Sequence, residues 1–131
     1  MDKFLHIKLN TYIEVFKDSI TFIDTKGGAE LYMLKDLAKR KLFGYAIYSI
    51  KLYFHQYLVS VSYSFEASLD EYPDLMDCIS LALRQKPQII VEQGISFFKW
   101  DNQLEALYCF PDFENNKILL YHTLKEYDII V

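Results

Sequence analysis

The sequence predicts an α+β domain in which a curved antiparallel sheet carries about two helices on one face. Most of the chain consists of short segments in which apolar residues alternate with polar ones, as in half-buried strands. Two segments instead carry apolar residues at helical spacing. The hydrophobic fraction of 52% can fill one core, and only four Gly and three Pro occur, so we expect a single globular domain over residues 1–131.

The chain is expected to begin with three strands and to continue into a helix. Residues 3–9 have strand-like composition, and residues 11–16 and 20–24 form a further pair that a three-residue break would join as a hairpin. Gly27-Gly28 then breaks the pattern, which predicts a flexible turn. The first helix is predicted over residues 29–42, with the apolar stripe Leu31, Leu34, Ala38 and Leu42.

The strongest sheet signal lies between residues 45 and 68. From Tyr57 to Phe65, apolar residues alternate with a polar set that is mostly Ser. The segment 46–54 alternates in the same way, so we expect Phe54-His55-Gln56 to join two strands as a hairpin. A polar second face is typical of an antiparallel sheet.

A second helix is predicted over residues 73–85, where apolar residues again recur at helical spacing. Pro73 fits the first helical position. A capping box at Ser68–Glu71 would begin the helix earlier and place Pro73 inside it, so we favour the later start. The remaining strands are predicted at 89–92, 95–100, 104–110, 117–124 and 127–131.

Motifs for metal binding, cofactor binding and catalysis are not recognisable in the chain. The three histidines, His6, His55 and His122, lie in three different segments, and the two cysteines, Cys78 and Cys109, lie in apolar surroundings. Neither set has the close spacing of a zinc site. No phosphate-binding glycine loop or nucleophile elbow occurs. We therefore expect no metal and no cofactor, and a binding protein rather than an enzyme.

Charge is unevenly divided along the chain, and this asymmetry predicts a basic partner. Residues 1–65 hold nine basic and six acidic side chains, whereas residues 66–131 hold five and twelve. Helix-dipole stabilisation and solubility account for some of these acids, but four acids within residues 70–77 exceed what a helix start needs. The candidate partner-binding residues are Asp70, Glu71, Asp74, Asp77, Asp101, Asp112 and Glu114.

Nucleic acid and membrane are poor candidates for the partner. The pI of about 5.3 disfavours phosphate binding, despite a basic strip over residues 35–41. Lys51, His55 and Gln56 interrupt the most apolar stretch, so no membrane span is predicted. Residues 1–4 do not resemble the start of a secretory signal, and the cysteines suggest no disulfide framework, so we expect a cytoplasmic location.

The chain contains eleven Tyr, ten Phe and one Trp, and this aromatic excess leaves two alternatives open. One is a small ligand-binding or enzymatic domain with an aromatic-lined pocket, for which Trp100, Tyr108 and Tyr121 are candidates. The other is a homodimer or larger oligomer joined through aromatic side chains of the sheet.

In size, acidity, aromatic content and lack of a catalytic motif, the chain resembles the small bacterial immunity proteins of contact-dependent growth inhibition and other polymorphic toxin systems. The resemblance implies a one-to-one complex with a cognate toxin domain, often a basic nuclease, whose active site or substrate face is blocked. The acidic residues named above would then face Lys and Arg of the toxin.

Overall fold

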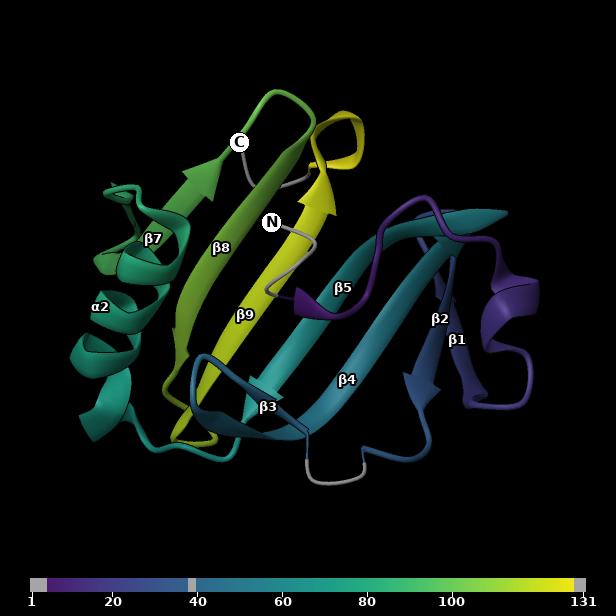
Figure 1. The fold of residues 1–131 in the computed structure, drawn as a ribbon, viewed down its shortest axis with the longest axis horizontal. Coiled ribbons are helices and arrows are strands. Elements are labelled where there is room, and N and C mark those ends of the chain that lie inside the picture. Colours follow the sequence, from purple (N-terminus) through teal and green to yellow (C-terminus); the bar gives the residue numbers. More distant parts are fainter. Residues whose placement is uncertain (1–4, 38–39, 129–131) are drawn as a thin grey trace.

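The structure is a computed structural model that describes residues 5–37 and 40–128. The strands of this part of the chain form one antiparallel sheet with the order β1-β2-β4-β5-β9-β8-β7-β6, and β3 pairs with β4 (Figure 1). The strands are β1 Ile20–Lys26, β2 Ala29–Leu34, β3 Lys41–Leu42, β4 Tyr45–His55, β5 Tyr57–Phe65, β6 Gln88–Glu92, β7 Ile95–Asp101, β8 Glu105–Asp112 and β9 Lys117–Leu124. 

A single α-helix, α2 (Tyr72–Leu83), occurs in the described part of the chain, together with the 3₁₀ turns η1 (Ile13–Phe16), η2 (Leu69–Glu71) and η3 (Lys125–Tyr127). The fold is therefore mainly β. The predicted α+β class, with two helices packed on one face of the sheet, is wrong, because residues 29–34 and 41–42 of the segment expected to form the first helix are strands.

The turn at Gly27-Gly28 explains this difference. Both glycines have positive φ, 55° and 84°, and Lys26 pairs with Ala29 across them. Two consecutive residues with positive φ make the tight turn that matches the twist of a β-hairpin. Chain reversal at this point makes the following residues, 29–34, pair with β1 instead of starting a helix.

Three further expectations at the ends of the chain differ from the structure. Residues 13–16 form η1 instead of a strand, and the described part of segment 3–9, residues 5–9, lies outside any strand. Tyr127 belongs to η3, and residues 129–131 lie outside the described part, as do residues 3, 4 and Ala38.

The strands predicted between residues 45 and 124 are confirmed. β4 and β5 pair as the expected hairpin, and β6, β7, β8 and β9 follow at the expected positions. The helix occupies residues 72–83 instead of 73–85, with Pro73 at its start. The capping box at Ser68–Glu71 also exists, because it caps the short turn η2 that leads into α2.

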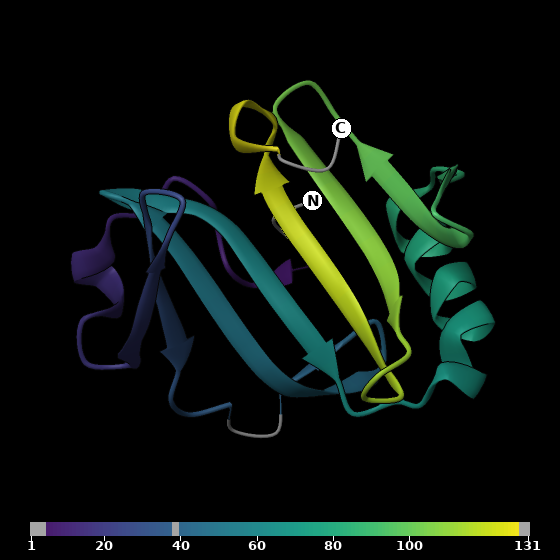
Figure 2. The same cartoon turned by 180° about the vertical axis from the view of Figure 1, so that it is seen from behind.

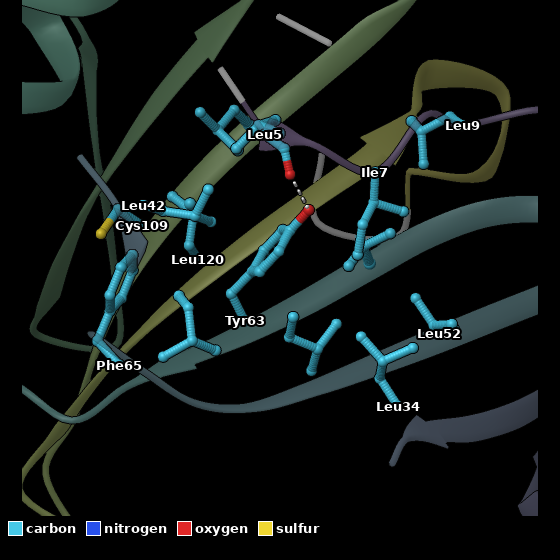
Figure 3. Packing of buried hydrophobic residues seen from close by; sticks show 14 of the residues in the cluster. Leu5, Ile7, Leu9, Leu34, Leu42, Leu52, Tyr63, Phe65, Cys109 and Leu120 are labelled. Carbon is cyan, nitrogen blue, oxygen red and sulfur yellow. Dashed lines mark hydrogen bonds between the residues drawn. The ribbon is translucent and has the colours of Figure 1, made fainter. Parts of the chain in front are cut away.

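One face of the sheet is covered by α2 and by the N-terminal segment, which crosses in front of β5 in Figure 1. α2 buries Leu75, Met76 and Ile79 against this face. Leu5, Ile7 and Leu9 of the N-terminal segment are buried in the same core, above the sheet residues seen in Figure 3. The main hydrophobic core therefore lies between the sheet and these two covering segments.

The opposite face carries no helix in the described part of the chain (Figure 2). A smaller cluster of Phe97, Ala106 and Tyr108 lies apart from the main core, with Ile90, Phe110 and Tyr121 packed against it. This face also carries Ser60 and Ser62 of β5, which alternate with the core-facing Val61 and Tyr63. It is the face on which the sheet can form an open cleft.

Candidate functional site

Six of the seven candidate acids lie at one end of the sheet. Four follow one another in η2 and the first turns of α2, and two lie in and next to the turn between β8 and β9, which is at the bottom of Figure 1 like the start of α2. The backbone N–H of Leu69 in η2 donates to Oδ1 of Asn116 in this turn, at 3.2 Å. We call this surface the acidic end: Asp70, Glu71, Asp74, Asp77, Asp112 and Glu114.

Three of these acids accept hydrogen bonds from other described residues. Glu71 accepts from the backbone N–H of Ser68 at 3.2 Å, and Asp112 accepts from the side-chain amide of Asn115 at 2.9 Å. Asp74 accepts from the hydroxyl of Tyr45, and this hydrogen bond is the main reason why the pKa of Tyr45 rises to about 12. These hydrogen bonds give the three carboxylates a structural explanation.

The other three acids have no such explanation. Asp70, Asp77 and Glu114 are exposed, and no hydrogen bond or ion pair to another described residue is seen for them. Uncompensated carboxylates on one surface raise the local negative potential, which attracts a positively charged molecule.

Asp101 lies away from the acidic end. It ends β7 at the opposite end of the β7–β8 pair from Asp112, and its carboxylate forms an ion pair with Nζ of Lys125 at 3.1 Å. The structure therefore does not bring Asp101 together with the other six candidates.

Exposed aromatic side chains accompany the acidic end. Phe113 is 64% exposed in the β8–β9 turn. Tyr48 is 61% exposed on β4, and Nζ of Lys117 lies 5.1 Å from the centre of its ring. Large aromatic side chains beside charges are typical of residues that dominate the energy of protein interfaces.

The open face of the sheet holds a second candidate site, a cleft of about 670 Å³. Tyr53 and Tyr121 form an aromatic floor, with ring centres 6.3 Å apart in an edge-to-face arrangement. The hydroxyl of Tyr121 donates to Oγ of Ser60 at 3.1 Å, and Ser60 in turn bonds to the hydroxyl of Thr123 at 2.7 Å. These bonds hold the floor residues in place. Ser62, Phe110 and Leu119 also line it.

The rim of the cleft comes from two segments that extend past the sheet. Lys26 ends β1 and Gly27 begins the β1–β2 turn, and the 3₁₀ turn η3 and the residue after it contribute Glu126, Tyr127 and Asp128. The ring of His55 stacks on that of Tyr127 with centres 5.0 Å apart, and the hydroxyl of Tyr127 lies 3.2 Å from that of Tyr57. The rim therefore offers both positive and negative groups above an aromatic floor.

The pocket residues predicted from the sequence are only partly found at this cleft. Tyr121 lines it, but Trp100 is buried in the main core on the other face of the sheet. Tyr108 is buried beside the cleft, and its hydroxyl donates to Asp128 at 2.5 Å. Sequence reasoning missed Tyr53 and Ser60. The alternating Ser residues of β5 were the sequence feature that could have indicated the cleft, but they predicted only a solvated face of the sheet.

His122 and Cys109 are buried and are exposed on neither surface. His122 is fully buried, with Nε2 bonded to the carboxylate of Glu105. Burial raises the pKa of the Cys109 thiol well above its ordinary value, which makes it a poor nucleophile. Among the described residues, no group of three His, Cys, Asp or Glu side chains is placed to hold a metal ion.

Comparison with known proteins adds no assignment. No protein-family model matches the sequence, and neither a curated protein nor a solved structure is significantly similar to it. Within residues 5–37 and 40–128, no helix has the length and apolar character needed to cross a membrane.

Proposed function

We propose that this chain is a protein-binding domain of the immunity type, which neutralises a basic toxin domain by docking through its acidic end. The observation that carries the proposal is the gathering of six carboxylates from two separate chain segments, residues 70–77 and 112–114, on one end of the sheet. A basic toxin bound there would have its active site or substrate face covered.

Electrostatic steering is the physical role of the acidic end. Opposite charge on two surfaces accelerates their encounter and aligns them, and this effect weakens as salt rises. The exposed rings of Tyr48 and Phe113 would then supply apolar contact area that charges alone do not provide. Charge would therefore govern the association rate, and the rings would govern the lifetime of the complex.

The test starts by isolating the partner. The chain is immobilised, exposed to an extract of the producing host, and the captured protein is identified by mass spectrometry. Its association rate is then measured by stopped flow with the wild type and with the double variant Asp70→Lys/Asp77→Lys, which spares the three acids that accept hydrogen bonds. We expect slower association of the variant at low salt and a smaller difference at high salt.

The matched control is Glu14→Lys/Asp18→Lys, which makes the same change in net charge on exposed residues at η1. The control should affect association much less than the variant at the acidic end. Equal slowing by both pairs would mean that only total charge matters, and a captured partner without a basic surface would also contradict the proposal.

A small-molecule binding function is the second candidate, and the 670 Å³ cleft is the observation that favours it. A thermal-shift screen of common metabolites and short peptides would test it, with Lys26→Ala and His55→Ala as rim variants and the exposed Lys17→Ala as control. A ligand that stabilises the wild type and the control, but not the rim variants, would support this function. Stabilisation that persists in the rim variants would place the ligand elsewhere.

A further inference from the structure

The strand β6 leaves one of its edges open. It is the terminal strand of the sheet and pairs with β7 alone among the described strands. Its residues Ile89 and Val91 are 63% and 64% exposed, although β-branched apolar side chains are normally buried. An open edge of this kind is a template for pairing with another strand.

The geometry of the β6–β7 hairpin shows which backbone groups are available. Gln93 and Gly94 form a two-residue turn with positive φ at both positions, and Glu92 pairs with Ile95 across it. In such a hairpin, the pair that flanks the turn is hydrogen-bonded, and bonded and non-bonded pairs then alternate. The N–H and C=O groups of Ile89 and Val91 therefore point away from β7, toward the open edge.

We propose that a second copy of this chain pairs with β6 in antiparallel orientation, with Ile90 at the two-fold axis. In this register, Ile89 lies opposite Val91 of the second copy, and Gln88 lies opposite Glu92. The outward backbone groups of Ile89 and Val91 then form four hydrogen bonds across the axis. The result is one continuous sheet through both copies.

The sequence of β6, Gln-Ile-Ile-Val-Glu, is self-complementary in this register. Ile89 and Val91 are two β-branched apolar residues that cover each other on one face, and Ile90 meets its own copy on the other face. Gln88 can donate its amide hydrogens to the carboxylate of Glu92, so no like charges lie opposite each other. A two-fold interface requires this kind of self-complementarity, since the same surface serves both copies.

The other edge of the sheet is protected in a way that β6 is not. β1 has a bulge between Phe22 and Asp24, where its register with β2 shifts. Bulges and charged residues on an edge strand disfavour pairing with a further strand. β6 pairs with β7 in unbroken register from Gln88 to Glu92, so its outer edge stays regular.

The size of β6 sets the expected strength of the dimer. Five residues of strand bury much less surface than the roughly 1,200–2,000 Å² typical of stable complexes. We therefore expect a weak dimer in exchange with the monomer, with a population that rises with protein concentration.

The first test is sedimentation velocity of the wild type over concentrations from about 10 µM to about 1 mM, the range in which weak complexes form. The wild type should shift from monomer toward dimer. Val91→Lys, which brings a lysine to each side of the axis, should stay monomeric over the same range. The control Val15→Lys replaces a valine that is 72% exposed in η1, and it should dimerise like the wild type.

The second test fixes the register by disulfide trapping in a Cys78→Ser background, where the remaining Cys109 is buried. Ile90→Cys should form a disulfide with its own copy, because the Cα atoms of a non-hydrogen-bonded pair lie about 4.5 Å apart, within disulfide range. Val91→Cys should not, because Ile89 is opposite it. A wild type that is monomeric at every concentration, a Val91→Lys dimer, or faster trapping through position 91 than 90 would each overturn the proposal.

Discussion

The hydroxyl of Tyr63, in the middle of the sheet, donates a hydrogen bond to the backbone carbonyl of Leu5 at 3.1 Å (Figure 3). Both residues are almost completely buried. Residues 5–9 cross the sheet here outside any strand, so this bond satisfies a backbone carbonyl in a buried position. Tyr63 thus fixes the position of a covering segment that contributes Leu5, Ile7 and Leu9 to the core.

Replacing Tyr63 with Phe tests this anchor. The ring would still fill its place, but the carbonyl of Leu5 would lose a partner, so we expect the free energy of unfolding to fall by about 1–3 kcal/mol. Urea denaturation measures this change, with Tyr48→Phe on the exposed surface as the control that should stay near the wild type. An equal, small effect of both variants would show that the hydroxyl of Tyr63 does not stabilise the N-terminal segment.

The turn at Gly27-Gly28 should respond differently at its two positions. Gly28 has φ of 84°, a conformation in which a β-branched side chain is strained, so Gly28→Val should destabilise the fold by about 1–2 kcal/mol. Asn adopts positive φ more easily and is common at the first turn position, so Gly27→Asn should change stability little. Thermal unfolding of both variants checks this difference. If both variants lost the same stability, the turn would not be of the type that the φ values of Gly27 and Gly28 indicate.

The same turn shows why part of the fold could not be predicted from the sequence. Leu31 and Leu34 have a spacing that suits one face of a helix, and both are buried, but as residues of β2. What decides the structure is the preceding Gly-Gly turn, which directs this segment back along β1. Where alternation was long and unbroken, as over Tyr57–Phe65, the strand and its hairpin partner were predicted correctly.

The grouping of four acids at residues 70–77 is easier to predict from the sequence than the lining of the cleft, for a related reason. Asp70, Glu71, Asp74 and Asp77 are close in sequence, so any helix start at this point groups them. The cleft needs Tyr53 of β4 and Tyr121 of β9, which meet only because β5 lies between their strands in the sheet. Strand order depends on long-range packing, and the sequence of one chain does not reveal it.

The packing of α2 on the sheet gives a prediction with an internal control. Ile79 of α2 is fully buried, whereas Leu81, two residues further along the same helix, is 81% exposed. Ile79→Ala should lower the free energy of unfolding by about 2–5 kcal/mol, because it removes buried methyl groups and leaves a cavity. Leu81→Ala should have little effect. Chemical denaturation measures both losses. If Leu81→Ala lowered the free energy of unfolding more than Ile79→Ala does, this placement of the helix would be wrong.

The hydrogen bond between Tyr45 and Asp74 predicts a stability change at alkaline pH. The pKa of Tyr45 is raised to about 12 in the folded protein, chiefly because its hydroxyl donates to Asp74, whereas in the unfolded chain it is near 10. The folded state therefore holds this proton more tightly. The stability that the bond contributes is fully present below pH 10 and is lost as pH rises from about 10 to about 12.

Tyr45→Phe is the variant that isolates this effect. Burial also raises the pKa values of Tyr72 and Tyr108, so the wild type and the variant share the alkaline destabilisation that those groups cause. The comparison is therefore the difference in urea midpoint between the two proteins, measured at several values from pH 8 to pH 12. We expect the wild type to be more stable at pH 8, and this advantage to shrink above pH 10. If the difference in urea midpoint stayed constant up to pH 12, the hydrogen bond to Asp74 would not raise the pKa of Tyr45.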